Sequence, residues 1–478
     1  MNRALTSLAL ICSATALAAN YPVGQVMVVD DTTGAQHDPD QLPPLGLMGE
    51  ALCKYAAKGL YTQFTDQYDG VVMFTTHPMN TMALGIQNTM LGNIVRQTDQ
   101  GISDTAFISL GGNPAVSYGS PAKLSHCVFM GSLPQLPQSP DDQATMLFGG
   151  FLPIGMGITG AELMGHEYGH HWMLWATYDK NDGKGKRYLM RGDTSASPQD
   201  PASPNGHYNH YSDARSVMYG SFITKLGPGN YKLEGGVRKY NHFDQYFMGL
   251  RAANEVSPLM IVDDGSNSGR GAAVQPIWRT GGGMSMTGSD FTVDIADVVR
   301  AVGPRVPSSA TAQKCLRVAF VLVSHQGHVA SAAEIAKVDA YRQRFQSWWT
   351  FATDGRGQMD TTLTGPAGCQ AGDGGVVLVP DAGRPDAGVD AGVPDAGRPV
   401  EPDAGQPMTP DAGSVADAGQ QNPVEPVDAG RPPGKWDTQV DQGTNKLKPG
   451  CGCQGTQPGL LGLFSLLGLA ARRRRRLP

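Results

Sequence analysis

The spacing of apolar residues along the chain predicts both strands and helices. Short apolar runs at Val71 to Thr75 and at Val318 to Val323 lie among Gly-rich turns, which is typical of buried strands. Farther along, Ser331 and Glu334 have capping-box spacing, and five apolar residues then recur at helical spacing. These five are Ile335, Val338, Tyr341, Phe345 and Trp348. We therefore expect one α+β domain over residues 20–365, in which this helix packs against the core.

The apolar pattern stops abruptly at residue 371, where a tract rich in Asp-Ala-Gly and Pro begins. The triplet starts at Asp381, Asp386, Asp390, Asp395, Asp403, Asp411, Asp417 and Asp428. Between Ala371 and Lys435, eleven acidic and four basic side chains leave a difference of −7, so like charges repel along the segment. Because large apolar residues are almost absent, the segment cannot bury enough surface to fold. We predict a disordered linker over residues 371–448 that acts as a solvated spacer.

Residues 1–19 have the features of a secretory signal peptide. Arg3 supplies positive charge, the run from Ala4 to Ala16 is mostly apolar, and Ala16 to Ala18 offers small residues for cleavage. The sequence therefore predicts that the protein is exported.

Residues 449–478 form a third kind of segment. Cys451-Gly452-Cys453 precedes a short apolar run from Gly459 to Ala471, and five arginines follow, Arg472 to Arg476. The apolar run is shorter than the roughly 20 residues that span a bilayer, and the arginines are expected to stay in the cytoplasm. In order and spacing the segment resembles the MYXO-CTERM sorting signal. The resemblance implies cleavage near Cys451 or Cys453 by a sorting protease and anchoring at the cell envelope, with membrane contact only through this tail. An ordinary C-terminal membrane anchor is the alternative.

Charge and cysteine content narrow the classes of function. The net charge of −6 over 478 residues is small, and no basic stripe outside the last residues could follow a phosphate backbone, which argues against nucleic-acid binding.

An even number of cysteines in an exported domain indicates two disulfides. The four cysteines of the predicted domain are Cys53, Cys127, Cys315 and Cys369. Of three possible pairings we expect the first with the second and the third with the fourth, because each pair would link one half of the domain.

The strongest chemical signal is the segment from Gly165 to His171, with the sequence GHEYGHH. A Thr and a Glu with capping-box spacing precede it, which predicts that the segment lies on a helix. Residues four apart share one helix face, so His166 and His170 can present ring nitrogens to one zinc ion. Glu167 can then take a proton from a zinc-bound water and pass it to the leaving amine. The alternative is a buried pair of histidines that make ordinary hydrogen bonds.

This His-Glu-x-x-His motif resembles that of the zincin metallopeptidases. The resemblance implies a zincin-like α+β fold in which the active-site helix packs under a twisted mixed sheet. The chain departs from the metzincin branch, whose pattern requires Gly and His where this chain has Met173 and Ala176. The third ligand must therefore come from farther along the chain. The segment from Ser216 to Tyr219 resembles the Met-turn that supports the metal site of metzincins, although a plain loop with a buried Met explains it equally well.

Two downstream segments offer a third zinc ligand. The polar stretch 207–213 contains His207 and His210, and the apolar stretch 243–250 contains a single carboxylate, Asp244. Because a buried carboxylate needs a cation or good donors, we predict that Asp244 completes the zinc site, with His210 or His207 as the alternatives. Its Asp-x-Tyr order loosely resembles the segment that supplies the third ligand in the aspartate-liganded zincins. Capping of a helix is the competing explanation for this carboxylate.

Together these features predict an exported, surface-anchored zinc endopeptidase that hydrolyses proteins or peptides outside the cell. Tyr246 and Tyr219 are the candidates for stabilising the oxyanion. Glycan or lipid hydrolysis stays open, because the motif defines how water is activated and not the substrate. The alternative is a zincin-like adhesion or binding protein without turnover. Glu167 discriminates between the two, because a binding protein needs no base beside its metal.

Overall fold

The computed structural model describes most of the predicted domain. The described residues are 20–36, 45–77, 86–87, 91–103, 114–148, 152–173, 176–190, 206–208, 211–263, 284–365, 368–369 and 451–452. The chain divides into two units, Met1–Gly374 with Lys448–Pro478 and Gly375–Leu447, and every described residue belongs to the first. The predicted signal peptide (1–19), the linker (371–448) and His210 therefore lie outside the described residues, as does the tail apart from residues 451–452.

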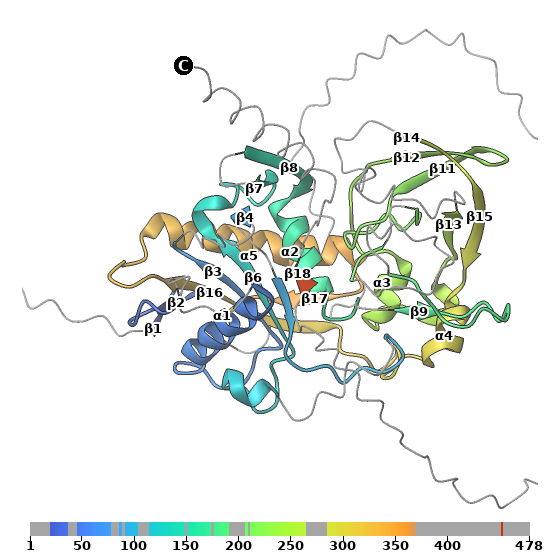
Figure 1. The fold of residues 1–478 in the computed structure, drawn as a ribbon. Coiled ribbons are helices and arrows are strands. Elements are labelled where there is room, and N and C mark those ends of the chain that lie inside the picture. Colours follow the sequence, from blue (N-terminus) through green and yellow to red (C-terminus); the bar gives the residue numbers. More distant parts are fainter. Residues whose placement is uncertain are drawn as a thin grey trace, which may run out of the picture. The chain divides into compact units, whose positions relative to one another are not determined.

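The largest sheet is mixed and has eight strands (Figure 1). Its order is β1-β2-β16-β3-β6-β5-β18, and β17 pairs with β16 off this path. The strands are β1 Asn20–Val23, β2 Val26–Asp30, β3 Gly70–Thr75, β5 Leu91–Ile94, β6 His126–Ser132, β16 Cys315–Ser324, β17 Gln358–Asp360 and β18 Cys451–Gly452. Neighbours among β2, β16, β3 and β6 run parallel, whereas β1, β5 and β18 add antiparallel strands at the edges. The predicted α+β class is therefore confirmed.

Both predicted buried strands lie next to each other inside this sheet. They fall in β3 and β16, which pair in parallel with Met73 opposite Val321. Every residue of β3 is buried, and so is every residue of β16 except the first, Cys315. A parallel strand covered on both faces reads as a continuous apolar run, which is the pattern seen in the sequence.

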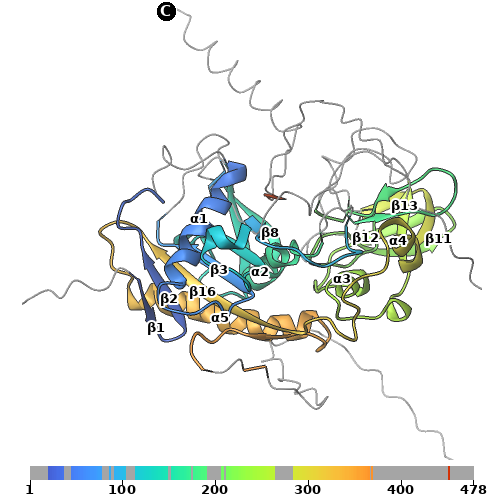
Figure 2. The ribbon, with the colours of Figure 1, turned by 90° about the horizontal axis from the view of Figure 1, so that it is seen from below.

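Helices cover both faces of the large sheet (Figures 1 and 2). α1 (Leu45–Leu60) packs on one face and shares an apolar cluster with Met73 of β3. α2 (Gly160–Gly169) and α5 (Ala332–Ala352) pack on the other face and share a second cluster with Phe74. Successive residues of a strand point to opposite faces, so each strand contributes to both layers.

Helix α5 begins where the sequence predicted. Ser331 is its N-cap, and a capping box with Glu334 is present. Four of the five apolar residues at helical spacing are buried, and Ile335 is half-buried against the core. The prediction of a core-packing helix is confirmed.

The remaining elements form smaller sheets and short helices. Three-stranded sheets are β4-β7-β8 and β11-β12-β14, and two-stranded sheets are β9-β10 and β13-β15. Their strands are β4 Ile86–Gln87, β7 Gln143–Phe148, β8 Leu152–Thr159, β9 Thr177–Tyr178, β10 Arg187–Tyr188, β11 Phe222–Gly227, β12 Asn230–Glu234, β13 Leu259–Asp263, β14 Met284–Thr287 and β15 Ser289–Val293. The helices are α3 His242–Phe247 and α4 Ile295–Val302, with 3-10 turns η2 Pro114–Tyr118, η3 Leu133–Gln135 and η4 Ala253–Glu255.

Two disulfides link segments that are distant in the sequence. Cys53 on α1 is bonded to Cys127 on β6, and Cys315 at the start of β16 is bonded to Cys369. This is the pairing expected from the sequence.

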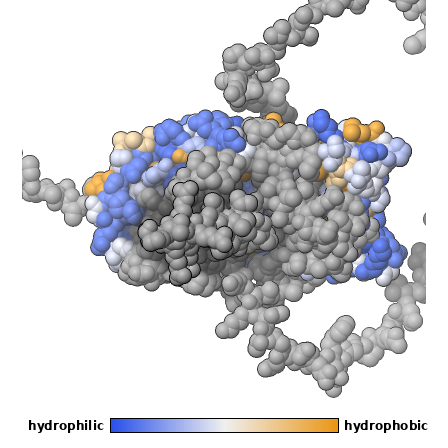
Figure 3. Space-filling model, turned by 45° about the horizontal axis from the view of Figure 1, so that its top comes forward, coloured by the Kyte–Doolittle hydropathy of each residue, from blue (hydrophilic) through white to orange (hydrophobic). Residues whose placement is uncertain are grey.

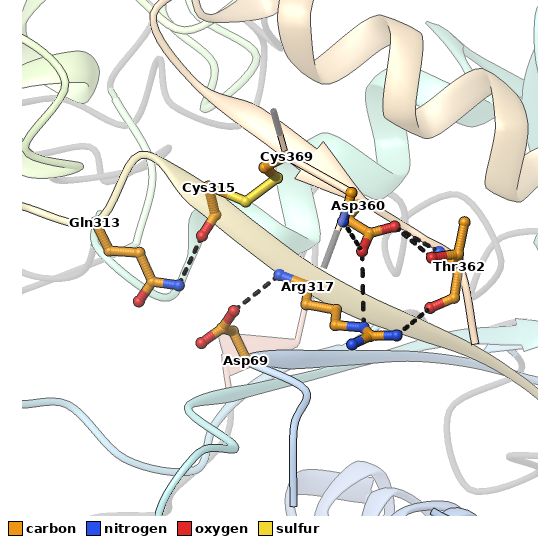
Figure 4. Close-up of a disulfide and its surroundings, with 8 residues drawn as sticks. Asp69, Gln313, Cys315, Arg317, Asp360, Thr362 and Cys369 are labelled. Carbon is orange, nitrogen blue, oxygen red and sulfur yellow. Dashed lines mark hydrogen bonds and ion pairs between the residues drawn. A yellow bond between two sulfur atoms is a disulfide. The ribbon is translucent and has the colours of Figure 1, made fainter. Parts of the chain in front are cut away.

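An ion pair lies beside the second disulfide (Figure 4). Arg317 Nε on β16 is 3.7 Å from Asp360 Oδ2 on β17, and both side chains are buried. The backbone N of Arg317 donates to Asp69 Oδ2 at 2.8 Å, and the Thr362 hydroxyl donates to Asp360 Oδ1 at 2.7 Å. These bonds hold the end of the domain against the sheet.

The described surface is mainly hydrophilic on the face shown in Figure 3. The large exposed apolar side chains are scattered along the sequence at Val23, Val116, Leu226, Val237, Val306, Val329 and Phe351. In the part of the chain that the structure describes, no helix has the length and apolar character needed to cross a membrane.

Candidate metal centre

Helix α2 and its C-cap carry two of the predicted ligands. The helix starts at its N-cap Thr159, whose hydroxyl accepts from Glu162 N at 3.2 Å while the Glu162 carboxylate accepts from Thr159 N at 2.8 Å. The helix ends at Gly169, and His170 occupies the C-cap with αR backbone angles. The helical offset between His166 and His170 is therefore kept, and their ring centroids lie 4.9 Å apart.

The third imidazole comes from His207. The ligand nitrogens of His166, His170 and His207 all lie within 4.8 Å of one another, and all three side chains are buried. The Nε2 atoms of His166 and His207 are 3.0 Å apart. Two nitrogens bound tetrahedrally to one zinc at about 2.05 Å would be about 3.3 Å apart, which is close to this spacing. The buried three-imidazole group can therefore hold a metal ion.

Burial keeps the three imidazoles uncharged at neutral pH. It lowers the pKa of His166 to about 4 and the pKa values of His170 and His207 well below 6.5, and neighbouring imidazoles add to the lowering at the last two. His166 Nδ1 donates to Val217 O at 2.7 Å, so its proton is on Nδ1 and the Nε2 lone pair faces His207. Among the described residues neither ring nitrogen of His170 has a hydrogen-bond partner. A metal ion would take up the lone pair of one of these buried nitrogens, so the residues present fit such an ion.

Glu167 is held in place by two strands of the large sheet. Its Oε2 accepts a hydrogen bond from Gly92 N of β5 at 2.9 Å, and its backbone O lies 3.2 Å from His126 Nε2 of β6. Burial lowers the pKa of His126 to about 3, so the neutral imidazole donates to this carbonyl. A Cβ at position 92 would overlap the Glu167 carbonyl oxygen, so only glycine permits this close approach. Gly92 and His126 could not be recognised from the sequence, because neither shares a spacing motif with the helix.

The segment from Ser216 to Tyr219 forms a tight turn against the end of α2. Ser216 N donates to Tyr219 O at 3.2 Å, and Tyr219 has a positive φ of 78°. A large side chain rarely adopts this conformation, which persists only where the surroundings constrain it. Met218 is fully buried, and its sulfur lies so close to Gly169 that a Cβ on this glycine would contact it. The turn therefore supports the helix end that carries His170.

Of the two candidate tyrosines, Tyr219 lies against the imidazoles. Its ring centroid is 4.6 Å from that of His166 and 4.4 Å from that of His207, with interplanar angles of 22° and 21°. Tyr246 lies on α3, where its hydroxyl accepts a hydrogen bond from Arg305 N at 3.0 Å. Contact with the candidate ligands thus favours Tyr219 for any role at this site.

Asp244, the predicted third ligand, lies in a cluster of hydrogen-bond donors. It is not a member of the three-imidazole group that the described residues form. It occupies position N3 of the capping box of α3, and its oxygens accept from Tyr208 Oη at 2.9 Å, Ser216 Oγ at 2.5 Å and Asn241 N at 2.9 Å. These donors satisfy the buried carboxylate without a cation. The third imidazole is supplied by His207, one of the two alternatives.

Comparison of the chain with protein-family models, with curated proteins and with solved structures finds no match. The chemistry of the site and the motif that forms it are therefore the features of this chain that bear on its function.

Proposed function

We propose that this protein is an exported zinc-dependent metallopeptidase. The observation that carries the proposal is the buried group of His166, His170 and His207, with Glu167 next to the first of them on α2. The His-Glu-x-x-His arrangement resembles that of the zincins, and a mixed sheet packed against the helix suits a zincin-like fold. The turn that places buried Met218 against the same helix adds a further resemblance.

Three neutral imidazoles favour zinc as the metal. Imidazole is a common zinc ligand, and structural zinc sites normally have four protein ligands. Catalytic zinc sites have three and keep the fourth position for water. The described residues supply three such ligands, which favours a catalytic site. A zinc ion held there would provide a water molecule with a pKa near 7.

The protein's own residues would then move the proton and hold the ligands. Glu167 takes the proton of the attacking water and delivers it to the leaving amine. The hydrogen bond from Gly92 N to Glu167 Oε2 restricts the rotation of this carboxylate. Tyr219 stacks on two of the imidazoles and limits their tilt. Base and ligands are therefore preorganised by groups on other elements.

The two ends of the chain indicate where the enzyme would act. The signal peptide over residues 1–19 directs export, and the MYXO-CTERM-like tail over residues 449–478 directs processing by a sorting protease and anchoring at the cell surface. The linker over residues 371–448 would hold the catalytic domain away from the envelope. Substrates would then be proteins or peptides outside the cell.

Metal content and proteolysis, measured on the same purified protein, test the proposal. We expect about one zinc per chain, digestion of casein, loss of digestion with a chelator and recovery when zinc is restored. His207→Ala should lose the metal. His242→Ala should keep it, because the imidazole of His242 contacts Ser257 on the surface. Bound zinc without digestion would favour the zincin-like binding protein, and wild-type protein without metal would contradict the metal centre itself.

A further inference from the structure

We infer that Asp244 is a positioning residue of the proposed metal centre, whose carboxylate joins the segment carrying His207 to the turn that supports His166. The inference rests on the proposed metal binding by the three imidazoles. Asp244 is fully buried on α3, an element that supplies none of these imidazoles. It acts on the centre through two neighbouring residues, Tyr208 and Ser216.

The first connection runs through Tyr208, the residue after His207. Tyr208 Oη donates to Asp244 Oδ1 at 2.9 Å, and the tyrosine ring is fully buried. The backbone N of Tyr208 donates to Met218 O at 2.9 Å. Side chain and backbone of Tyr208 are thus both anchored, so the adjoining His207 has little freedom to move away from the other imidazoles.

The second connection runs through Ser216, the first residue of the turn. Its Oγ donates to Asp244 Oδ2 at 2.5 Å and accepts from Met218 N at 2.8 Å. The intervening residue, Val217, accepts the hydrogen bond from His166 Nδ1 at 2.7 Å. Asp244 therefore holds the carbonyl group that orients His166.

An ionised carboxylate suits this position because it has two acceptor oxygens and no donor. Oδ1 accepts from Tyr208, whereas Oδ2 accepts from both Ser216 and Asn241. An amide at position 244 would turn its N–H group either towards Asn241 N, which cannot accept a hydrogen bond, or towards Tyr208 Oη, whose hydroxyl would then have to accept instead of donate. Asp244→Asn should therefore weaken the hold on either the turn or the His207 segment while keeping the size of the side chain.

Asp297 provides a matched control. It occupies the same N3 position of a capping box, in α4, and accepts a hydrogen bond from Asp294 N at 2.9 Å. Its described side-chain partners are Lys180 and Arg300. Asp297→Asn therefore perturbs a helix cap and its ion pairs without touching the residues that hold the three imidazoles.

The test measures the zinc affinity of the full chain by competition with a chromophoric chelator. We expect Asp244→Asn to lower the affinity by about 10- to 100-fold while one zinc still binds at saturation, as for other residues that orient metal ligands. Tyr208→Phe and Ser216→Ala should each lower it by a smaller factor. Asp297→Asn should leave it unchanged even if its melting temperature falls.

The outcomes separate this inference from the proposed function. Wild-type affinity in all three variants of the network would overturn the positioning role while leaving the metal centre intact. Loss of stoichiometric binding in Asp244→Asn, with wild-type affinity in Tyr208→Phe and Ser216→Ala, would make Asp244 a ligand and equally overturn it. If Asp244→Asn does not fold, the tyrosine and serine variants still decide the question. Wild-type protein without zinc would refute the proposed function and this inference with it.

Discussion

The two regions that supply the imidazoles are held in different ways. Helix α2 and its cap set His166 and His170 one turn apart through local backbone hydrogen bonds, with ring centroids 4.9 Å apart. His207 lies in a segment whose described residues, 206–208 and 211–221, form neither helix nor extended strand. It is held by residues distant in sequence, because its neighbour Tyr208 bonds to Asp244, 36 positions away.

This difference predicts which property a substitution in each region should change. In a helix the backbone hydrogen bonds fix which residues share a face, so a side chain can be exchanged without moving the backbone. An irregular segment depends on every long-range bond that holds it, so loss of one bond changes the geometry. Substitutions on α2 other than at its two imidazoles should therefore change chemistry or packing, whereas substitutions around His207 should change metal affinity.

The largest expected effect is on the helix side, at Glu167. Glu167→Gln should lower peptide hydrolysis by about 10²- to 10⁴-fold, because an amide cannot take the proton of water. Zinc content should not change, since Glu167 is not among the three imidazoles that could hold the metal. The control is Glu162→Gln, on the same helix, whose carboxylate serves the capping box. Turnover and metal content of both variants check this prediction, and full activity in Glu167→Gln would remove the proposed mechanism.

The next largest effect is the pH dependence of stability that Asp244, which contacts the region around His207, should produce. Burial raises the pKa of Asp244 from 3.8 to about 6, although hydrogen bonds from Ser216, Asn241 and Tyr208 oppose the shift. The folded state therefore holds this proton more tightly than the unfolded state, so the contribution of Asp244 to stability falls as pH rises from about 4 to about 6. A pKa that differs by about two between the folded and unfolded states corresponds to roughly 3 kcal/mol of unfolding free energy.

Denaturant titrations of metal-free wild type and Asp244→Asn at several pH values measure this contribution. The unfolding free energy of the wild type should fall relative to that of Asp244→Asn as the pH rises from about 4 to about 6. Above about pH 6 the difference between the two should stay constant. A difference that stays constant across this window would mean that the carboxyl group titrates normally.

A smaller effect is expected from the packing of the helix. Gly165 of α2 faces Trp348 of α5, and a Cβ at position 165 would overlap the indole ring. Gly165→Ala should therefore cost about 1–3 kcal/mol of stability, although alanine favours helices. Gly227→Ala is the control, because its Cβ would meet nothing within 4 Å. Urea unfolding of both variants distinguishes overpacking from a general effect of alanine, and equal stability in the two would contradict the close contact.

The smallest effect is expected in the turn, at Met218. Met218→Leu keeps volume and apolar character, so it should cost less than about 1.5 kcal/mol and leave zinc affinity nearly unchanged. Chelator competition together with thermal unfolding measures both quantities. A large loss of zinc affinity here would show that the sulfur atom itself is needed to support the metal centre.

Features that depend on neighbours along the chain could be predicted from the sequence. The strands β3 and β16, the capping boxes of α2 and α5, and the offset between His166 and His170 all follow from residue spacing. The disulfide pairing was also expected, on the argument that each bond links one half of the domain. For the strands, the caps and the histidine offset the deciding interaction is local or follows from the need to bury an apolar run, whereas the disulfides join residues 74 and 54 positions apart.

Only the tertiary structure showed which residue joins His166 and His170 as the third imidazole, and which residues surround helix α2. The sequence indicated that the carboxylate of Asp244 is buried. It did not show whether a cation or a set of hydrogen-bond donors satisfies this carboxylate, because the donors Tyr208 and Ser216 lie 36 and 28 positions away in the sequence. The contacts of Gly92 and His126 with Glu167 depend in the same way on the pairing of β5 with β6. Backbone spacing is set by covalent geometry, whereas the meeting of distant side chains is set by how the elements pack.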